Sequence, residues 1–172
     1  TPTQDGWHAC GPECCMGALA SGDVELIEYS YPIILHQYSL ITDSGGAGKF
    51  RGGSGTCWEV EPLDQPMTFI MFGEGRKYPS LGSAGAFSTL LENKVGKVEI
   101  KRNGKVEVIK KNIIETISPG QRVANINPGG GGFGNPLERP LEKVIMDVKN
   151  GLVSKNGARE DYGVIFFDQD SN

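Results

Sequence analysis

Apolar and polar residues alternate in short runs along the first half of the chain, a pattern typical of β-strands with one buried face. Three runs rich in β-forming residues, at 23–31, 33–41 and 56–62, are predicted to be strands, and Pro32 separates the first two. A fourth run, at 66–72, is almost continuously apolar between turn residues, so we expect a buried strand there.

The clearest local pattern is that of a β-hairpin. Alternating runs at 95–101 and 105–109 flank Arg102-Asn103-Gly104, and an Asn-Gly pair between such runs is a strong hairpin signal. Two further strands are predicted at 113–117 and 121–126.

Helical spacing is concentrated near the C-terminus. Between 140 and 150 the apolar residues recur at the spacing of one helix face, and Gly151 occupies a C-cap position. Ser154 is a suitable N-cap for a second short helix, and 162–167 is expected to pack back as an extended segment. The pattern predicts an α+β fold, a β-rich single domain over 1–172 with short helices near its C-terminus.

Composition narrows the class of protein. The 172 residues are 38% hydrophobic, with a net charge of −4 and a pI near 5.2, which argues against a general nucleic-acid binder. No stretch approaches the length of a membrane span, and no charged and apolar leader marks secretion, so we expect a cytoplasmic protein without a membrane partner.

Charge is distributed unevenly along the chain. The segment 93–111 carries seven Lys and Arg against two Glu, a local excess of +5. One interpretation is a solvated hairpin with lysines on its outer face. The other is a docking surface for an acidic partner subunit.

Three of the four cysteines crowd together near the N-terminus. His8, Cys10, Cys14 and Cys15 could be counted as four zinc ligands, but adjacent cysteines rarely face one metal and no second pair follows. Reduced packing or loop cysteines, a zinc site and redox activity all stay open, and we expect no structural disulfide in a cytoplasmic chain.

Two glycine-rich blocks, at 43–55 and 127–136, hold 11 of the 25 glycines. The first block is not a phosphate loop, because Asp43 stands where the first glycine of a Walker A sequence belongs and Phe50 where its hydroxyl residue belongs. A dinucleotide-binding glycine pattern fails as well, because Arg51 stands at its last glycine position.

The glycine blocks are nevertheless the best candidate binding loops. Exposed backbone N–H groups in such loops bind anions, and Arg51 offers a bidentate fork. The candidate residues are Asp43, Gly45, Gly46, Arg51, Gly129, Gly130, Gly131 and Gly132. In the alternative interpretation the glycines only permit close backbone packing, and Arg51 pairs with Asp43 or another nearby carboxylate.

No catalytic constellation is evident in the sequence. His36, Ser44 and Asp43 could be assembled into a Ser-His-Asp site on paper, but proximity in sequence proves no geometry. The remaining acidic residues are scattered, so the catalytic residues stay unassigned.

Several segments resemble the hydantoinase B/oxoprolinase family. They are EYSYP at 28–32, DSGGAGKFRGGSG at 43–55, SPGQ at 118–121, NPGGGGFGNPLER at 127–139, VKNGLVS at 148–154 and AREDYGV at 158–164. Their order and spacing extend over nearly the whole chain, which is similar to the C-terminal part of family members about three times as long.

The resemblance implies a role in a multisubunit, ATP-dependent enzyme. Family members open cyclic amides such as hydantoins, oxoproline or lactams, or carboxylate ketones. The implied partners are a hydantoinase A-like ATP-binding subunit and the N-terminal hydantoinase B-like portion, so we expect a hetero-oligomer. ATP and a divalent metal would be bound by those partners and no cofactor by this chain, which would not be catalytic alone. A non-catalytic assembly module is the alternative.

Overall fold

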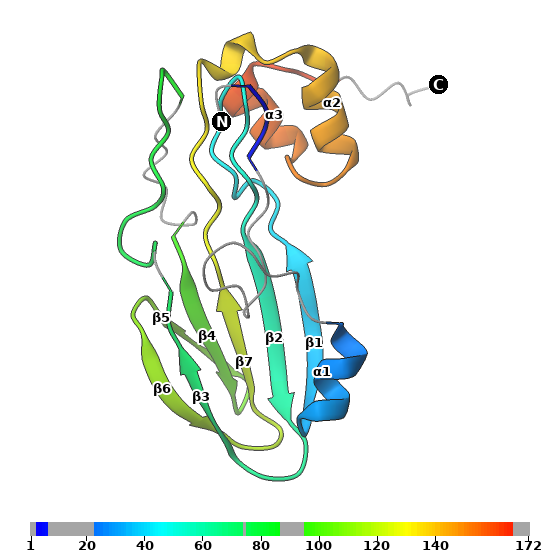
Figure 1. Ribbon diagram of the computed structural model, residues 1–172, viewed down its shortest axis with the longest axis vertical. Coiled ribbons are helices and arrows are strands. Elements are labelled where there is room, and N and C mark those ends of the chain that lie inside the picture. Colours follow the sequence, from blue (N-terminus) through cyan, green and yellow to red (C-terminus); the bar gives the residue numbers. More distant parts are fainter. Residues whose placement is uncertain (1–2, 7–22, 74, 87–94, 167–172) are drawn as a thin grey trace.

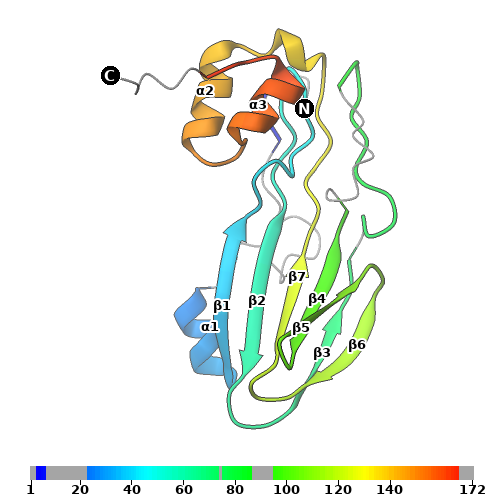
Figure 2. The same cartoon turned by 180° about the vertical axis from the view of Figure 1, so that it is seen from behind.

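The computed structural model describes residues 3–6, 23–73, 75–86 and 95–166. The molecule is elongated, with its β-sheets at one end and two C-terminal helices at the other (Figure 1). Extended segments that contain the two glycine blocks run between these ends (Figures 1 and 2).

The strands form two antiparallel sheets. The larger one has the order β1-β2-β7-β4-β5, and the smaller one pairs β3 with β6. The strands are β1 (Ile33–Leu40), β2 (Thr56–Pro62), β3 (Met67–Met71), β4 (Lys97–Arg102), β5 (Lys105–Ile109), β6 (Ile113–Ile117) and β7 (Arg122–Ile126). All seven were predicted, and the hairpin is confirmed in detail, with Asn103 and Gly104 at φ angles of 51° and 71°.

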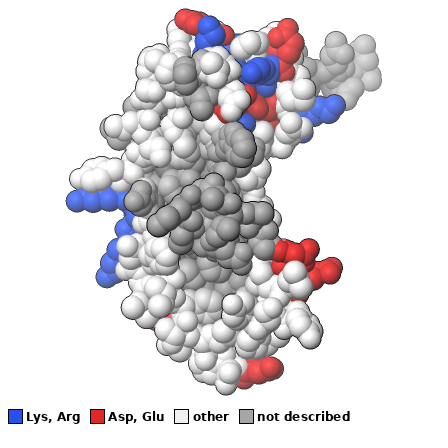
Figure 3. Space-filling view, viewed as in Figure 1, with Lys and Arg blue, Asp and Glu red and all other residues white. Residues whose placement is uncertain are grey.

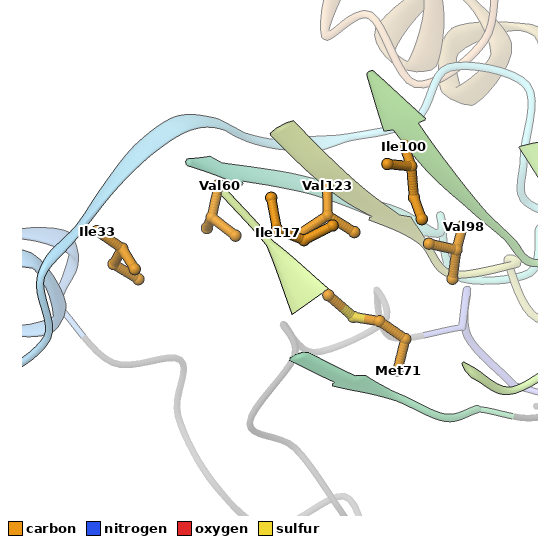
Figure 4. Close-up of a cluster of buried hydrophobic side chains, with 7 residues drawn as sticks. All are labelled: Ile33, Val60, Met71, Val98, Ile100, Ile117 and Val123. Carbon is orange, nitrogen blue, oxygen red and sulfur yellow. The ribbon is translucent and has the colours of Figure 1, made fainter. Parts of the chain in front are cut away.

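The main hydrophobic core lies between the two sheets, where Figure 4 shows its side chains gathered. Its buried members are Ile33, Val60, Met71, Val98, Ile100, Ile117 and Val123. The prediction that 66–72 forms a buried strand was wrong about its burial. Only one face of the two-stranded sheet meets the core, so the cross-strand partners Ile70 and Ile114 stay 64% and 69% exposed.

The strand predicted at 23–31 is instead a helix, α1 (Val24–Ser30). Asp23 initiates it, because its carboxylate accepts hydrogen bonds from the N–H groups of Glu25 and Leu26. Farther along, the Glu28 carboxylate accepts a bond of 2.7 Å from the N–H of Leu35 in β1. The helix lies beside β1 at the sheet edge (Figure 2), so capping and edge protection outweigh the β propensity of the segment.

The C-terminal helices match their predictions. A 3-10 turn, η2 (Pro136–Glu138), leads to α2 (Leu141–Lys149) and α3 (Lys155–Tyr162). Gly151 has the expected positive φ, and the Ser154 hydroxyl accepts a bond of 2.9 Å from the N–H of Gly157. A second core forms here from Ala47, Val144, Val153, Ala158 and Tyr162.

These elements confirm the α+β class, although α1 adds a helix away from the C-terminus. The residues beyond α3 that the structure describes have no regular secondary structure, but Val164 and Phe166 pack against the second core. None of the described helices is long and apolar enough to cross a membrane.

We expect the core between the sheets to dominate the stability of this end of the molecule. Replacing Ile100, which is 1% exposed, by alanine should lower the free energy of unfolding by about 2–5 kcal/mol. Ile114→Ala is the matched control, because the same atoms are removed from a 69% exposed position, and it should cost about 1 kcal/mol or less. Urea unfolding of both variants measures the difference, and equal losses would contradict the placement of the core.

Candidate functional site

The two glycine blocks meet in one place, which we call the glycine junction (residues 44–55 and 127–134). Their backbones bond directly to each other. The N–H of Gly46 donates to the Gly130 carbonyl at 2.8 Å, and the N–H of Gly130 donates to the Gly53 carbonyl at 2.9 Å. Phe50 and Phe133 exchange a pair of bonds of 3.0 and 2.9 Å.

The junction has almost no room for side chains. A Cβ atom on Gly46 would lie 2.5 Å from the Gly132 nitrogen, and one on Gly48 would lie 2.7 Å from the Phe133 nitrogen. Gly130 differs, because its nearest neighbour would be 3.6 Å away. Most of these positions therefore require glycine because of close approach between backbones.

Two other segments extend the junction. The N–H of Ser83 donates to the Gly132 carbonyl and the Ser83 carbonyl accepts from the N–H of Gly134, both at 3.0 Å, and Gly131 packs against the Leu81 carbonyl. At the N-terminal side, the N–H of Gly6 donates to the Arg51 carbonyl at 2.7 Å. The junction therefore joins four parts of the chain that are far apart in sequence.

A buried network of charged side chains lies beside the junction. Asp147 of α2 accepts from Arg51 Nε at 3.2 Å and from Arg139 Nη2 at 2.7 Å, both at Oδ2. Arg139 also pairs with both carboxylate oxygens of Asp5, at 2.6 and 3.1 Å. The side chains of Arg51, Arg139 and Asp147 are 4%, 1% and 8% exposed, so these pairs are shielded from solvent.

Electrostatics within the network favour the charged forms. Burial alone would raise the pKa of Asp5, but its bonds to Arg139 and to the N–H of Arg51 lower it overall. Burial would lower the pKa of Arg139, and the contact with Asp5 outweighs this and raises it. The guanidinium of Arg139 also lies 5.9 Å from the ring centre of Tyr162, whose pKa is raised mainly by burial.

The structure places seven of the eight candidate residues within the junction, where close backbone packing and internal hydrogen bonds already occupy them. Gly45, Gly129 and Gly132 approach the carbonyls of Gly52, Ser44 and Ala47, respectively. Arg51 is not an open fork, because its Nη1 donates to its neighbour's carbonyl at 2.6 Å in addition to the contact with Asp147.

Asp43, the eighth candidate, faces the C-terminal helices. Its Oδ1 accepts a bond of 2.8 Å from the N–H of Ser154, and its own N–H donates to the Leu152 carbonyl at 3.0 Å. Asp43 has a positive φ of 60° and packs closely against Gly157. It therefore positions the start of α3 and does not pair with Arg51.

Asp5, Asp147 and Arg139 were not among the site residues predicted from the sequence. Asp147 left a usable signal, because it lies three residues after Val144 on the buried stripe of the helix, where a charge needs a partner. Asp5 and Arg139 carry no local signal, since their partners come from distant segments.

The hypothetical Ser-His-Asp site of Ser44, His36 and Asp43 is not formed. His36 Nε2 lies 2.8 Å from Glu61, whose pKa it lowers, and Ser44 bonds to the Ile41 carbonyl and the Gly55 N–H. Within the described ranges, no group of three or more His, Cys, Asp or Glu residues could hold a metal. The zinc candidates His8, Cys10, Cys14 and Cys15 lie outside the described residues.

The chain is similar in sequence to a known protein family and to a β subunit of known activity. The family model for hydantoinase B/oxoprolinase matches residues 1–136. The β subunit of caprolactamase from Pseudomonas jessenii is 59% identical over 162 residues, which is 94% of this chain and 28% of that protein.

Two solved structures share the fold. The ATP-dependent caprolactamase of Pseudomonas jessenii matches with a TM-score of 0.84 at 53% identity, over 100% of this chain and 30% of that chain. A nucleotide-free acetone carboxylase matches with a TM-score of 0.70 at 23% identity, over 94% and 25%, respectively, and supports the fold alone. The chain therefore spans less than a third of the length of these relatives.

The packing of the junction predicts opposite behaviour for two of its glycines. Gly46→Ala should destabilise the chain by about 1–3 kcal/mol, because the new methyl group meets the Gly132 backbone. Gly130→Ala should change stability by about 0.5 kcal/mol or less, because space is available there. Thermal and urea unfolding test this pair, and equal effects would argue against the backbone contact at Gly46.

The buried ion pairs generate a second prediction. Asp147→Asn leaves Arg51 and Arg139 without their shared countercharge and should cost about 3 kcal/mol or more. Glu138→Gln is the control, because Glu138 pairs with Lys49 at an exposed site, and its effect should stay below about 1 kcal/mol. Comparable urea midpoints for the two variants would show that the network contributes little.

Proposed function

The chain belongs to the hydantoinase B/oxoprolinase family, and we propose that it is part of the β-type component of an ATP-dependent enzyme that opens a cyclic amide. The proposed substrate class is a lactam of the caprolactam kind. The observation that carries this proposal is the 59% identity to a caprolactamase β subunit, together with a TM-score of 0.84 to a solved caprolactamase. Ketone carboxylation has weaker support, because the acetone carboxylase structure is only 23% identical.

The geometry favours a scaffolding role for this chain within such an enzyme. The glycine junction and its ion pairs fix four segments against one another, and a rigid scaffold of this kind holds neighbouring groups at constant distances. We propose that the chain shapes the active site and the subunit interface, and that it is not catalytic alone.

The proposed partners follow from the family. A hydantoinase A-like subunit would bind ATP and activate the amide by phosphorylation, and the N-terminal hydantoinase B-like portion would complete the second component. A divalent metal would be held by those partners, in a cytoplasmic hetero-oligomer. The chain covers 28% of the related β subunit, so most of such a component lies outside these 172 residues.

A pure assembly module is the second candidate, and one observation favours it. Arg51, the strongest side-chain candidate for substrate contact, is 4% exposed and already bonded to Asp147 and Gly52. In this version the junction determines whether the complex forms and has no contact with the substrate.

Reconstitution with the partner subunits tests the reaction. We expect ATP hydrolysis to be stimulated by ε-caprolactam, with release of 6-aminohexanoate, and not by acetone with bicarbonate. Stimulation by the ketone alone would contradict the proposal. Phosphate release and product formation are measured together, so that uncoupled ATP hydrolysis is recognised.

Variants in the same assay separate the two roles of the chain. Arg51→Ala and Asp147→Asn should reduce complex formation in parallel if Arg51 acts only through its ion pair. The turnover of the complexes that do form should then equal that of the unmodified enzyme. A loss of turnover specific to Arg51→Ala in intact complexes would instead place Arg51 at the substrate.

A further inference from the structure

A buried arginine lies near one end of the two sheets, away from the ion pairs described above. Arg76 follows β3 and is 7% exposed. Its Nε donates to Asn112 Oδ1 at 3.1 Å, and its Nη2 donates to Asn125 Oδ1 at 3.0 Å. Its Nη1 is buried and has no hydrogen-bond partner within the described residues.

Arg76 also lacks a countercharge in the part of the chain that the structure describes. Among the residues that the structure describes, no Asp or Glu forms an ion pair with it, whereas the buried Arg51 and Arg139 both contact Asp147. Burial lowers the pKa of Arg76, and no neighbouring charge is seen to raise it. A guanidinium stays protonated in proteins, so Arg76 is a buried cation whose partners among the described residues are the neutral amides of Asn112 and Asn125.

Two lysines lie next to Arg76 and its partner Asn112 in the sequence. Lys77 follows Arg76 directly, and Lys111 precedes Asn112; within the described part of the chain, neither lysine forms an ion pair with a carboxylate. Other cations of the basic segment are neutralised internally, in the pairs Lys97–Glu99, Lys101–Glu59 and Arg102–Glu115. Figure 3 shows Lys and Arg atoms at mid-height on one flank and Asp and Glu atoms on the opposite flank.

The guanidinium is held in a defined orientation. Asn125 Nδ2 donates to Asn127 Oδ1 at 3.1 Å, and Asn127 Nδ2 donates to Thr56 Oγ1 at 3.2 Å. This chain of bonds connects Arg76 to the first residue of the second glycine block. Asn112 is fixed as well, because its Oδ1 also accepts from the N–H of Gly73 at 3.2 Å. The unused N–H groups on Nη1 are therefore oriented before any partner arrives.

We propose that Arg76 is a docking residue for a carboxylate side chain on an acidic polypeptide segment outside this chain, which reaches the buried Nη1 when the atoms that cover it move aside. A guanidinium edge matches a planar carboxylate, and the flanking lysines would attract an acidic segment. The chain spans 28% of the related β subunit, so the proposed complex contains ample polypeptide to provide such a segment. The identity of the polypeptide that supplies the carboxylate rests on the proposed function. The observation that Arg76 has no carboxylate partner among the described residues does not.

The site can be tested first in this chain alone, by supplying the missing carboxylate. Asn112→Asp keeps the two bonds that Oδ1 accepts and places a negative charge beside Arg76. We expect the folding equilibrium constant to rise about tenfold. Asn103→Asp is the matched control, because it makes the same substitution in the turn that follows the last residue of β4. It should not raise the folding equilibrium constant to a comparable extent. Arg76→Gln should abolish the gain in a double-mutant cycle.

The same substitution should have the opposite effect on assembly. In the complex, Asn112→Asp occupies Arg76 and repels the incoming carboxylate, so the affinity of the chain for its partner components should fall at least about tenfold. Arg76→Gln should weaken assembly to a similar extent, and Asn103→Asp should not. A residue that acted only by bonding two asparagines would not produce this reversal of sign.

The docking role of Arg76 is overturned if Asn112→Asp fails to stabilise the chain relative to Asn103→Asp, or if assembly is unaffected by Asn112→Asp and Arg76→Gln. The stability of the chain against unfolding is also compared in sodium acetate and in sodium chloride at the same concentration. If acetate stabilised the chain more, and Arg76→Gln abolished that difference while assembly stayed unchanged, Arg76 would belong to a small-molecule site and the docking role would be overturned. Failure of the complex to turn over caprolactam, with the sign reversal intact, would reject only the proposed reaction.

Discussion

Direct contact between backbones is the constraint on which this structure depends. In the glycine junction, carbonyl and N–H groups of one block occupy the space that side chains of the other block would need. Glycine loses more conformational freedom on folding than other residues, so such a junction is costly unless the ordered state gains compensating contacts. The hydrogen bonds between the blocks and the buried ion pairs beside them provide those contacts.

The junction also explains how two separate hydrophobic cores form one molecule. One core lies between the sheets and the other beneath α2 and α3, and Ala47 brings the first glycine block into the second core. Asp147 on α2 bonds Arg51 of the glycine block and Arg139 before the helix. Because removing one member of a buried ion pair leaves the other without a partner, these pairs tie the glycine block and the helices together in one arrangement.

Local sequence signals were reliable where local chemistry decides the structure. The Asn103-Gly104 turn, the Gly151 stop signal and the Ser154 cap each adopt the conformation that their residue types favour. Prediction failed for α1, because a capping aspartate and the edge of β1 outweighed β propensity. It also failed for the burial of β3, because a two-stranded sheet packs by only one face and leaves Ile70 exposed.

The sequence by itself determined the seven strands and the two C-terminal helices in their order, the α+β class, the family and the importance of the glycine blocks. Each of these depends on residue type and spacing, which are visible along a chain. Only the tertiary structure decided that Arg51 pairs with Asp147 rather than Asp43, and that Arg76 is buried without a carboxylate among the described residues. The physical reason is that the value of a charge depends on its neighbours and its exposure, and both come from segments that are distant in sequence.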